Sequence, residues 1–135
     1  MGTLEKKMLE KFLSEKSEML SQFSKYVGLD NLTFDIKELE LIESTALKFI
    51  EDEGFAVLYN LYIGEVIINY IKGEWEIGKL KKDPAYHKPI ILKSDKSQIR
   101  ICPMADWFGL LKKGRLQEGI SGIVKVVIKC STAKE

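Results

Sequence analysis

The chain has 135 residues, of which 45% are hydrophobic and 30% are charged, and its formal net charge is +1. This length and composition predict one globular domain with a core of its own and exclude a disordered chain. No stretch approaches the roughly 18 uninterrupted apolar residues of a membrane span, and the N-terminus lacks the apolar core of a signal peptide, so we expect a cytoplasmic protein without membrane contact.

The two halves of the chain carry opposite charge. Residues 1–53 hold twelve acidic and seven basic side chains, whereas residues 54–135 hold eight acidic and fourteen basic ones. This division is typical either of two halves that attract each other within one fold or of two partner surfaces of opposite sign.

Cysteine and histidine are scarce. Cys102 and Cys130 lie far apart in the sequence, and without an export signal we expect two reduced thiols. His87 is the single histidine, and these three residues lack the close pairing typical of structural zinc sites. We therefore expect no metal and no other cofactor.

Two amphipathic helices are expected at the N-terminus. Residues 3–27 place apolar side chains at spacings of three and four, and Gly28 is a natural stop. After a turn-like stretch, Asp35 is a candidate N-cap for a second helix over residues 36–52.

The stretch LYNLYIGEVIINYIKGEW, residues 58–75, is apolar nearly all round. This pattern predicts a central helix over residues 55–72 that is buried on most sides and ends at Gly73. The run Val66-Ile67-Ile68 would also suit a strand, but roughly seventeen residues exceed the usual length of a strand and favour the helix.

The second half of the chain favours short strands. EWEIGKL, KPIILKS and SQIRICP are β-branched, partly alternating and separated by turn residues, so they predict a three-stranded antiparallel meander. A short helix is expected over residues 104–113, and residues 117–130 suit either a helix or a strand, with the helix favoured by their starting residues. The expected fold is a single α+β domain over residues 1–135, with two N-terminal amphipathic helices, a buried central helix, the meander and one or two C-terminal helices.

One face of the central helix is the first candidate site. Tyr62, Glu65 and Asn69 follow one another at helical spacing and interrupt an otherwise apolar surface. They predict a ligand pocket in which Glu65 is the key acid and Tyr62 and Asn69 orient the ligand. The structural alternative, which is more common, is that Glu65 accepts hydrogen bonds from a basic residue or from backbone groups, because an unpaired buried carboxylate is costly.

Acidic side chains in and after the second predicted helix are the second candidate site. Glu51, Asp52 and Glu53 fall at its expected C-terminal end, where acids are unfavourable, so a basic surface is expected to meet them. The predicted partner-contact residues are Glu38, Glu43, Glu51, Asp52 and Glu53.

Other partners have weaker support. Lysines accompany the predicted strands, but the chain holds two arginines and its aromatic residues are not interleaved with the basic ones on one face, so nucleic-acid binding is not expected. An uncovered apolar face on the first helix would allow a homodimer.

Residues 55–110 resemble small, uncharacterised bacterial α+β domains. The resemblance rests on Gly64-Glu65 in a central helix, on the Gly73-x-Trp75 step into a strand, and on Ile101-Cys102-Pro103 ahead of another helix. It implies a compact bacterial protein, some relatives being accessory or immunity-type binding proteins, and it implies no catalytic residues.

No catalytic motif accompanies these features. The chain lacks a Gly-x-Ser-x-Gly elbow and a phosphate-binding glycine loop. We therefore expect a cytoplasmic, non-enzymatic binding protein that acts by protein–protein contact in a regulatory or immunity-type role. The alternative is a small-ligand-binding protein or enzyme that uses the face of Tyr62, Glu65 and Asn69.

Overall fold

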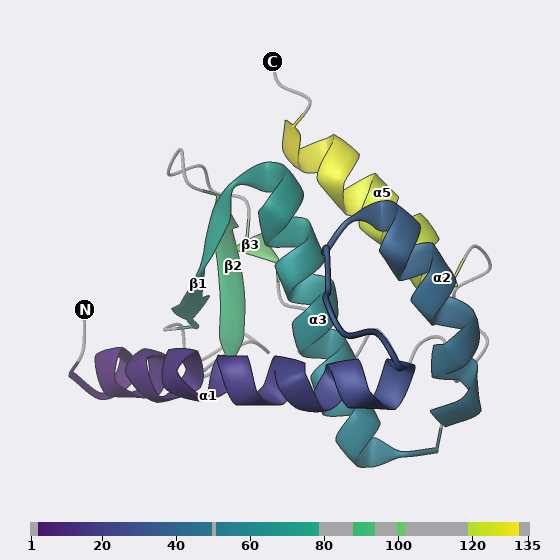
Figure 1. The fold of residues 1–135 in the computed structure, drawn as a ribbon. Helices are drawn as coiled ribbons and strands as arrows, with labels where there is room; N and C mark the ends of the chain where they lie inside the picture. The colour runs from purple at the N-terminus through teal and green to yellow at the C-terminus, as the bar shows by residue number, and fades with distance from the viewer. Residues whose placement is uncertain (1–2, 50, 79–87, 94–99, 102–118, 133–135) are drawn as a thin grey trace.

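The computed structural model describes residues 3–49, 51–78, 88–93, 100–101 and 119–132, which form a mostly helical α+β fold (Figure 1). The helices are α1 (Thr3–Val27), α2 (Ile36–Ala46), α3 (Glu53–Ile71) and α5 (Gly119–Thr132), with the short 3-10 helix η1 (Leu47–Phe49) after α2. The strands are β1 (Gly73–Ile77), β2 (Pro89–Lys93) and β3 (Arg100–Ile101). The helix expected over residues 104–113 lies outside the described residues.

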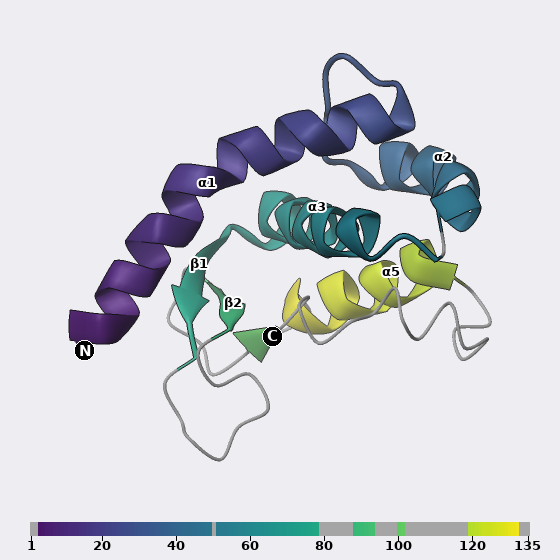
Figure 2. The ribbon, with the colours of Figure 1, turned by 90° about the horizontal axis from the view of Figure 1, so that it is seen from below.

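Helix α3 is the centre of the molecule, as its sequence predicts. It lies between α1 and α5, with the sheet beside its C-terminal end (Figure 2). Eleven of its nineteen residues are buried, and it is a helix throughout, so the strand interpretation of Val66-Ile67-Ile68 is wrong. By length and composition α3 could cross a membrane, but most of its apolar stretch is buried inside the protein, as in the core helix of a globular protein.

The boundary between α2 and α3 differs from the expected one. The predicted helix over residues 36–52 ends at Ala46, and Asp52 is instead the N-cap of α3, where its Oδ1 accepts the N–H of Phe55 at 3.0 Å. Glu53 lies in the first turn of α3. These acids therefore stand at the positive end of a helix dipole, where they are stabilising, and not at a negative end as expected.

The end of α3 is also built differently. Lys72, with φ 58°, adopts the left-handed conformation that closes the helix, and its N–H donates to the carbonyl of Ile68 at 2.9 Å. Gly73 is already the first residue of β1. The helix therefore closes at Lys72, one residue before the expected stop at Gly73. The tight turn directs β1 back along α1.

The described sheet has the order β1-β2-β3, with both neighbouring pairs antiparallel as the meander predicts. β1 pairs with β2 along its whole length, from Gly73 opposite Lys93 to Ile77 opposite Pro89, whereas β3 contributes two residues. Trp75 and Ile77 are buried, and Glu74 and Glu76 alternate with them toward the other face. β1 therefore forms one edge of this small sheet.

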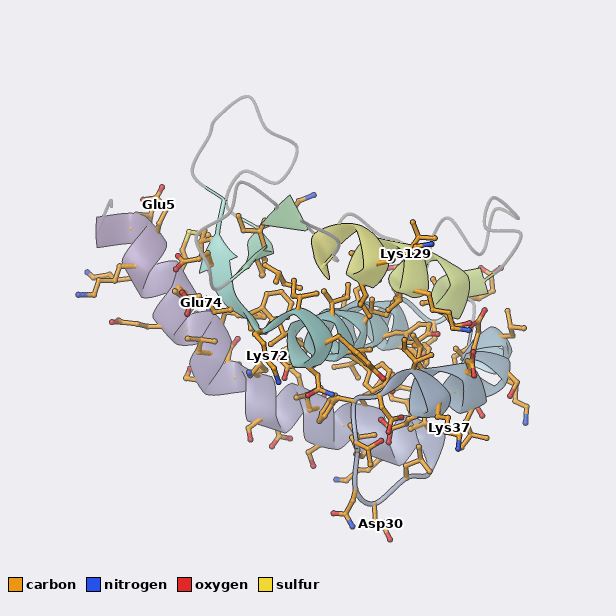
Figure 3. The ribbon with its side chains drawn as sticks, turned by 90° about the horizontal axis from the view of Figure 1, so that it is seen from above. Glu5, Asp30, Lys37, Lys72, Glu74 and Lys129 are labelled. Carbon is orange, nitrogen blue, oxygen red and sulfur yellow. The ribbon has the colours of Figure 1, made fainter. Side chains whose placement is uncertain are left out.

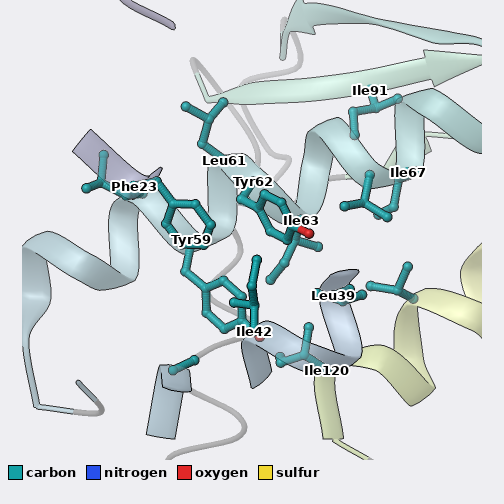
Figure 4. Packing of buried hydrophobic residues seen from close by; sticks show 14 of the residues in the cluster. Phe23, Leu39, Ile42, Tyr59, Leu61, Tyr62, Ile63, Ile67, Ile91 and Ile120 are labelled. Carbon is teal, nitrogen blue, oxygen red and sulfur yellow. The ribbon is translucent and has the colours of Figure 1, made fainter. Parts of the chain in front are cut away.

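Aromatic rings join α1 to the first half of α3. Phe23 of α1 is fully buried and stacks on Tyr62 at 4.8 Å between ring centroids, on Phe55 at 5.6 Å and on Tyr59 at 5.9 Å. Figure 4 shows Phe23, Tyr59 and Tyr62 packed beside the aliphatic side chains of the core. Each aromatic pair contributes about 0.5–1.5 kcal/mol beyond the burial of its area.

The C-terminal segment is a helix, as favoured. Its amphipathic face places Ile120 and Val124 in the core, both fully buried. The first N–H groups of α5 have no partner within the helix, and the Glu43 carboxylate of α2 accepts two of them, from Ile120 and Ser121, each at 3.0 Å. A side chain from another helix thus caps α5 and fixes its start.

Candidate functional site

The three residues of the predicted helix face have different partners. The hydroxyl of Tyr62 donates to Glu38 Oε1 at 2.8 Å, and Asn69 Nδ2 donates to the carbonyl oxygen of Phe34 at 2.9 Å. The first bond joins α3 to α2, and the second joins α3 to the segment that leads into α2. Glu65 instead bonds to α1 and β1. The three side chains therefore do not converge on one ligand.

The Glu38 carboxylate is closed to any ligand. It is 8% exposed, and it accepts hydrogen bonds from four donors. Its Oε2 accepts the N–H and the hydroxyl of Thr33 at 2.8 and 3.1 Å, and its Oε1 accepts the N–H of Phe34 and the hydroxyl of Tyr62 at 3.0 and 2.8 Å. Burial, and then the hydrogen bond to Glu38, raise the pKa of Tyr62. This cluster is a structural joint between α2 and α3.

The same joint holds a strained residue. Phe34 has φ 58°, a left-handed conformation that costs a bulky residue about 1–2 kcal/mol. Its N–H donates to Glu38 of α2 and its carbonyl oxygen accepts Asn69 of α3, so both of its backbone polar groups have partners. Asn69 therefore positions the backbone of this loop, which is a different role from the predicted contact with a ligand.

The predicted partner-contact acids fall into two groups. Three of them accept hydrogen bonds within the fold. Glu38 accepts Tyr62 and the backbone of residues 33–34. Glu43 accepts the first N–H groups of α5, and Asp52 accepts the N–H of Phe55 at the start of α3. Asp52 also accepts the hydroxyl of Tyr26 at 3.1 Å, a bond that raises the pKa of Tyr26. Glu51 and Glu53 have exposed side chains. The five residues thus form no continuous acidic surface.

A hollow of about 390 Å³ opens beside Glu65, between the first half of α1 and β1. Its lining combines apolar, acidic and basic side chains from three elements: Leu9, Leu13 and Lys16 of α1, Glu65 and Ile68 of α3, and Gly73, Glu74, Trp75 and Glu76. Sites for small ligands commonly have about 300–1,000 Å³ and a mostly apolar wall with a few polar groups. The hollow lies within this range of volume, but it is more open to solvent than an enclosed ligand cavity.

Glu65 uses only one of its two carboxylate oxygens for bonds within the described part of the chain. Its Oε2 accepts both Trp75 Nε1, at 2.7 Å, and Lys16 Nζ, at 3.1 Å. No described residue donates to Oε1, and the side chain is 15% exposed. The indole and the ammonium hold Glu65 in place while its second oxygen is left to accept a further donor.

The charge around the hollow is negative. Lys16 is the single cation among the described lining residues, and it is already bound to Glu65. Glu74 is exposed on β1 where this strand passes α1 (Figure 3). Glu76 is half-buried, and its Oε1 is shielded from solvent without a hydrogen-bond partner. The arrangement therefore suits a cationic group beside an apolar surface.

Sequence reasoning found Glu65 but missed its setting. Trp75 is 5% exposed with its ring edge-on to Phe12 at 5.0 Å, and its indole N–H donates to Glu65, a bond that the sequence did not indicate. Lys16 interrupts the apolar stripe of α1 between Phe12 and Met19. This charged residue among apolar ones is the sequence signal that could have indicated an acid opposite it.

The described residues contain no group of three or more histidine, cysteine, aspartate or glutamate side chains placed to hold a metal ion. Of the expected thiols and imidazole, Cys102 and His87 lie outside the described residues, and the side chain of Cys130 is likewise not described. What the described hollow offers chemically is carboxylates, one ammonium group, an indole and apolar surface.

No protein-family model, curated protein or solved structure matches this chain. The resemblance of residues 55–110 to small bacterial α+β domains therefore stays a prediction, and the functional assignment depends on the site itself.

Proposed function

We propose that this protein is a cytoplasmic, non-enzymatic binding protein that acts by contact with another protein, and that the hollow between α1 and β1 is its contact surface. The observation that carries the proposal is the Glu65 carboxylate, which lines the hollow, is fixed by Lys16 and Trp75 through one oxygen, and has no donor from the described residues on the other oxygen. A fixed acceptor that is already oriented binds a donor with little loss of side-chain entropy.

The surroundings of the hollow support a protein as the partner. The side chain of Leu13 belongs to its wall and is 44% exposed, and Glu74 on the β1 side of the hollow is exposed as well. The rim of the hollow thus presents an apolar and an acidic side chain to solvent, which a partner with a larger surface than a small molecule can cover. The acidic segment around residues 38–53 supports contact less well, because three of its five predicted residues are bound internally.

A small ligand is the second candidate, favoured by the volume of the hollow. It would use Glu65 without Tyr62 and Asn69, since Tyr62 bonds to Glu38 of α2 and Asn69 bonds to Phe34 just before α2. A small cation with an apolar body would satisfy the free oxygen of Glu65 and contact Leu9, Leu13 and Ile68.

Site-specific photocrosslinking separates these candidates. A photoreactive amino acid replaces Leu13 in the hollow or, as the matched control, Leu41, which is equally apolar and 64% exposed on α2. In extracts of cells that naturally make the protein, we expect a protein adduct of one mass from position 13 and none from position 41. The adduct should disappear when Glu65→Gln is added and persist with Glu40→Gln.

Each alternative gives its own result. Adducts of equal yield from both positions, or none from position 13, would contradict a protein contact at the hollow. A molecule of low mass that co-purifies with the wild type and is lost in Glu65→Gln would instead favour the small ligand.

A further inference from the structure

The outer edge of β1 has backbone groups that form no hydrogen bond with any described residue. The N–H of Gly78 donates to the carbonyl of Lys88 at 3.0 Å, which fixes the hydrogen-bonded pairs of the β1–β2 ladder. In an antiparallel ladder such pairs alternate with pairs whose N–H and C=O groups point away from each other. Glu74 and Glu76 therefore bond to β2, and Gly73, Trp75 and Ile77 direct their backbone groups to the outer edge.

No described residue forms a hydrogen bond with these outward-pointing groups. β1 is the terminal strand of the described sheet, and beyond its edge lies the hollow, whose far wall is formed by the side chains of α1. Native proteins usually cover or blunt such an edge, because an open row of N–H and C=O groups accepts another strand. Here the edge and the hollow form one continuous feature along residues 73–76.

Side chains on the two faces of β1 specify what such a strand would carry. Glu74 and Glu76 stand on one face, and opposite charges on neighbouring strands stabilise each other by about 0.2–1 kcal/mol for each pair. Trp75 stands on the other face, where it contacts Phe12 of α1, and the apolar wall of the hollow lies close by. A complementary strand would therefore alternate basic and apolar residues.

We propose, on the basis of the proposed function, that the occupant of the hollow is an extended segment of a partner protein that adds as a fourth strand to the outer edge of β1. Its basic side chains lie beside Glu74 and Glu76, which stand on the same face of β1. Its apolar side chains enter the hollow beside Leu9, Leu13 and Ile68. Main-chain hydrogen bonds supply affinity, and the alternating side chains supply specificity.

Hydrogen exchange of the full-length protein with a defined probe tests this proposal. The probe is an end-capped eight-residue peptide that alternates lysine and valine, and the control peptide alternates glutamate and valine. With the lysine peptide at saturation, the amides of Gly73, Trp75 and Ile77 should exchange at least tenfold more slowly, whereas those of Glu74 and Glu76, already bonded to β2, should not change. The glutamate peptide should bind at least tenfold more weakly.

Backbone methylation of the probe tests the pairing itself. Methylating the amide nitrogens of all valines blocks one edge of the peptide, and methylating those of all lysines blocks the other. One isomer should lose binding by tenfold or more and the other should keep it, since only one set of amides faces β1. Equal affinity of both isomers would contradict strand addition.

Charge variants complete the test. Glu74→Lys should weaken the lysine peptide at least tenfold, whereas Glu15→Lys, at an exposed acid of α1 that does not line the hollow, should leave its affinity unchanged. A concentration-dependent dimer that protects the same three amides without any peptide would show a second copy as the occupant and overturn the proposal.

Failure of this inference is distinguishable from failure of the proposed function. If no alternating peptide protects the edge but the protein adduct at position 13 still forms, contact at the hollow stands and strand addition is wrong. If neither result is obtained, both proposals are wrong.

Discussion

On each of two sides of α3 a carboxylate accepts a hydrogen bond from an aromatic side chain, and the two carboxylates differ in how many of their oxygens have donors. Toward α2, Glu38 is 8% exposed and has four donors divided between its two oxygens. Toward α1 and β1, Glu65 is 15% exposed and has two donors on one oxygen. A carboxylate whose acceptor positions are filled stabilises the fold, whereas one with a free oxygen at a hollow can also bind.

The largest expected effect is on the closed side. Glu38→Ala leaves the N–H groups of Thr33 and Phe34 and the hydroxyl of Tyr62 without their acceptor, and each buried donor left unsatisfied costs about 1–3 kcal/mol. We expect the free energy of unfolding, measured by urea denaturation, to fall by more than about 3 kcal/mol.

Glu40→Ala is the matched control on the same helix. Glu40 pairs with Lys125 at the surface, with both side chains about half exposed, and such pairs contribute about 0–1 kcal/mol. Similar losses for the two variants would show that the Glu38 cluster is not the joint described above.

A smaller effect is expected from alkaline pH. Because burial and Glu38 raise the pKa of Tyr62 above its ordinary value of 10.0, the folded state keeps a proton that the unfolded state releases. The stabilisation is complete below pH 10 and is lost as the pH rises above it, by about 1.4 kcal/mol for each pH unit from this one group.

Tyr62→Phe should remove this contribution. Its free energy of unfolding, followed by urea denaturation between pH 9 and 12, should follow the pH dependence of the wild type below pH 10 and decline less steeply above it, by about 1.4 kcal/mol for each pH unit. Equal slopes would mean that Tyr62 titrates in the folded state as it does in the unfolded chain.

The smallest effect on stability is expected on the open side. Glu65→Gln keeps an oxygen that can accept Trp75 Nε1 and loses only the charge that faces Lys16, which is 28% exposed. Partly exposed ion pairs contribute about 0–1 kcal/mol, so the free energy of unfolding should fall by less than about 1 kcal/mol. The indole N–H resonance of Trp75 should remain shifted by its hydrogen bond. A loss as large as that of Glu38→Ala would make Glu65 a structural residue and remove the contrast between the two sides.

Features that depend on residues close in sequence were predicted well. The apolar stripe and Gly28 define α1, whose end has φ 73° at that glycine, and an apolar surface all round defines the buried α3. The short β-branched runs likewise gave the strand order and direction of the described sheet. Helical and strand periods are local properties, so a sequence reveals them directly.

The errors arose where the same local pattern has two meanings. From sequence alone, Asp52 and Glu53 can belong to the end of one helix or to the start of the next. In the structure the Asp52 side chain accepts the N–H of Phe55, which places the start of α3 there. Tyr62, Glu65 and Asn69 share a helical face by spacing, but their hydrogen-bond partners come from residues 33–38 on one side and from α1 and β1 on the other.

The sequence by itself thus determined which segments are helices or strands and that α3 is buried, because periodicity and hydrophobicity act within a few residues. Only the tertiary structure decided which acids are saturated and which remain available. A carboxylate's donors come from wherever the fold brings them, 49 residues away for Lys16 and Glu65 and 24 for Tyr62 and Glu38, and no local pattern says which donor meets which acid.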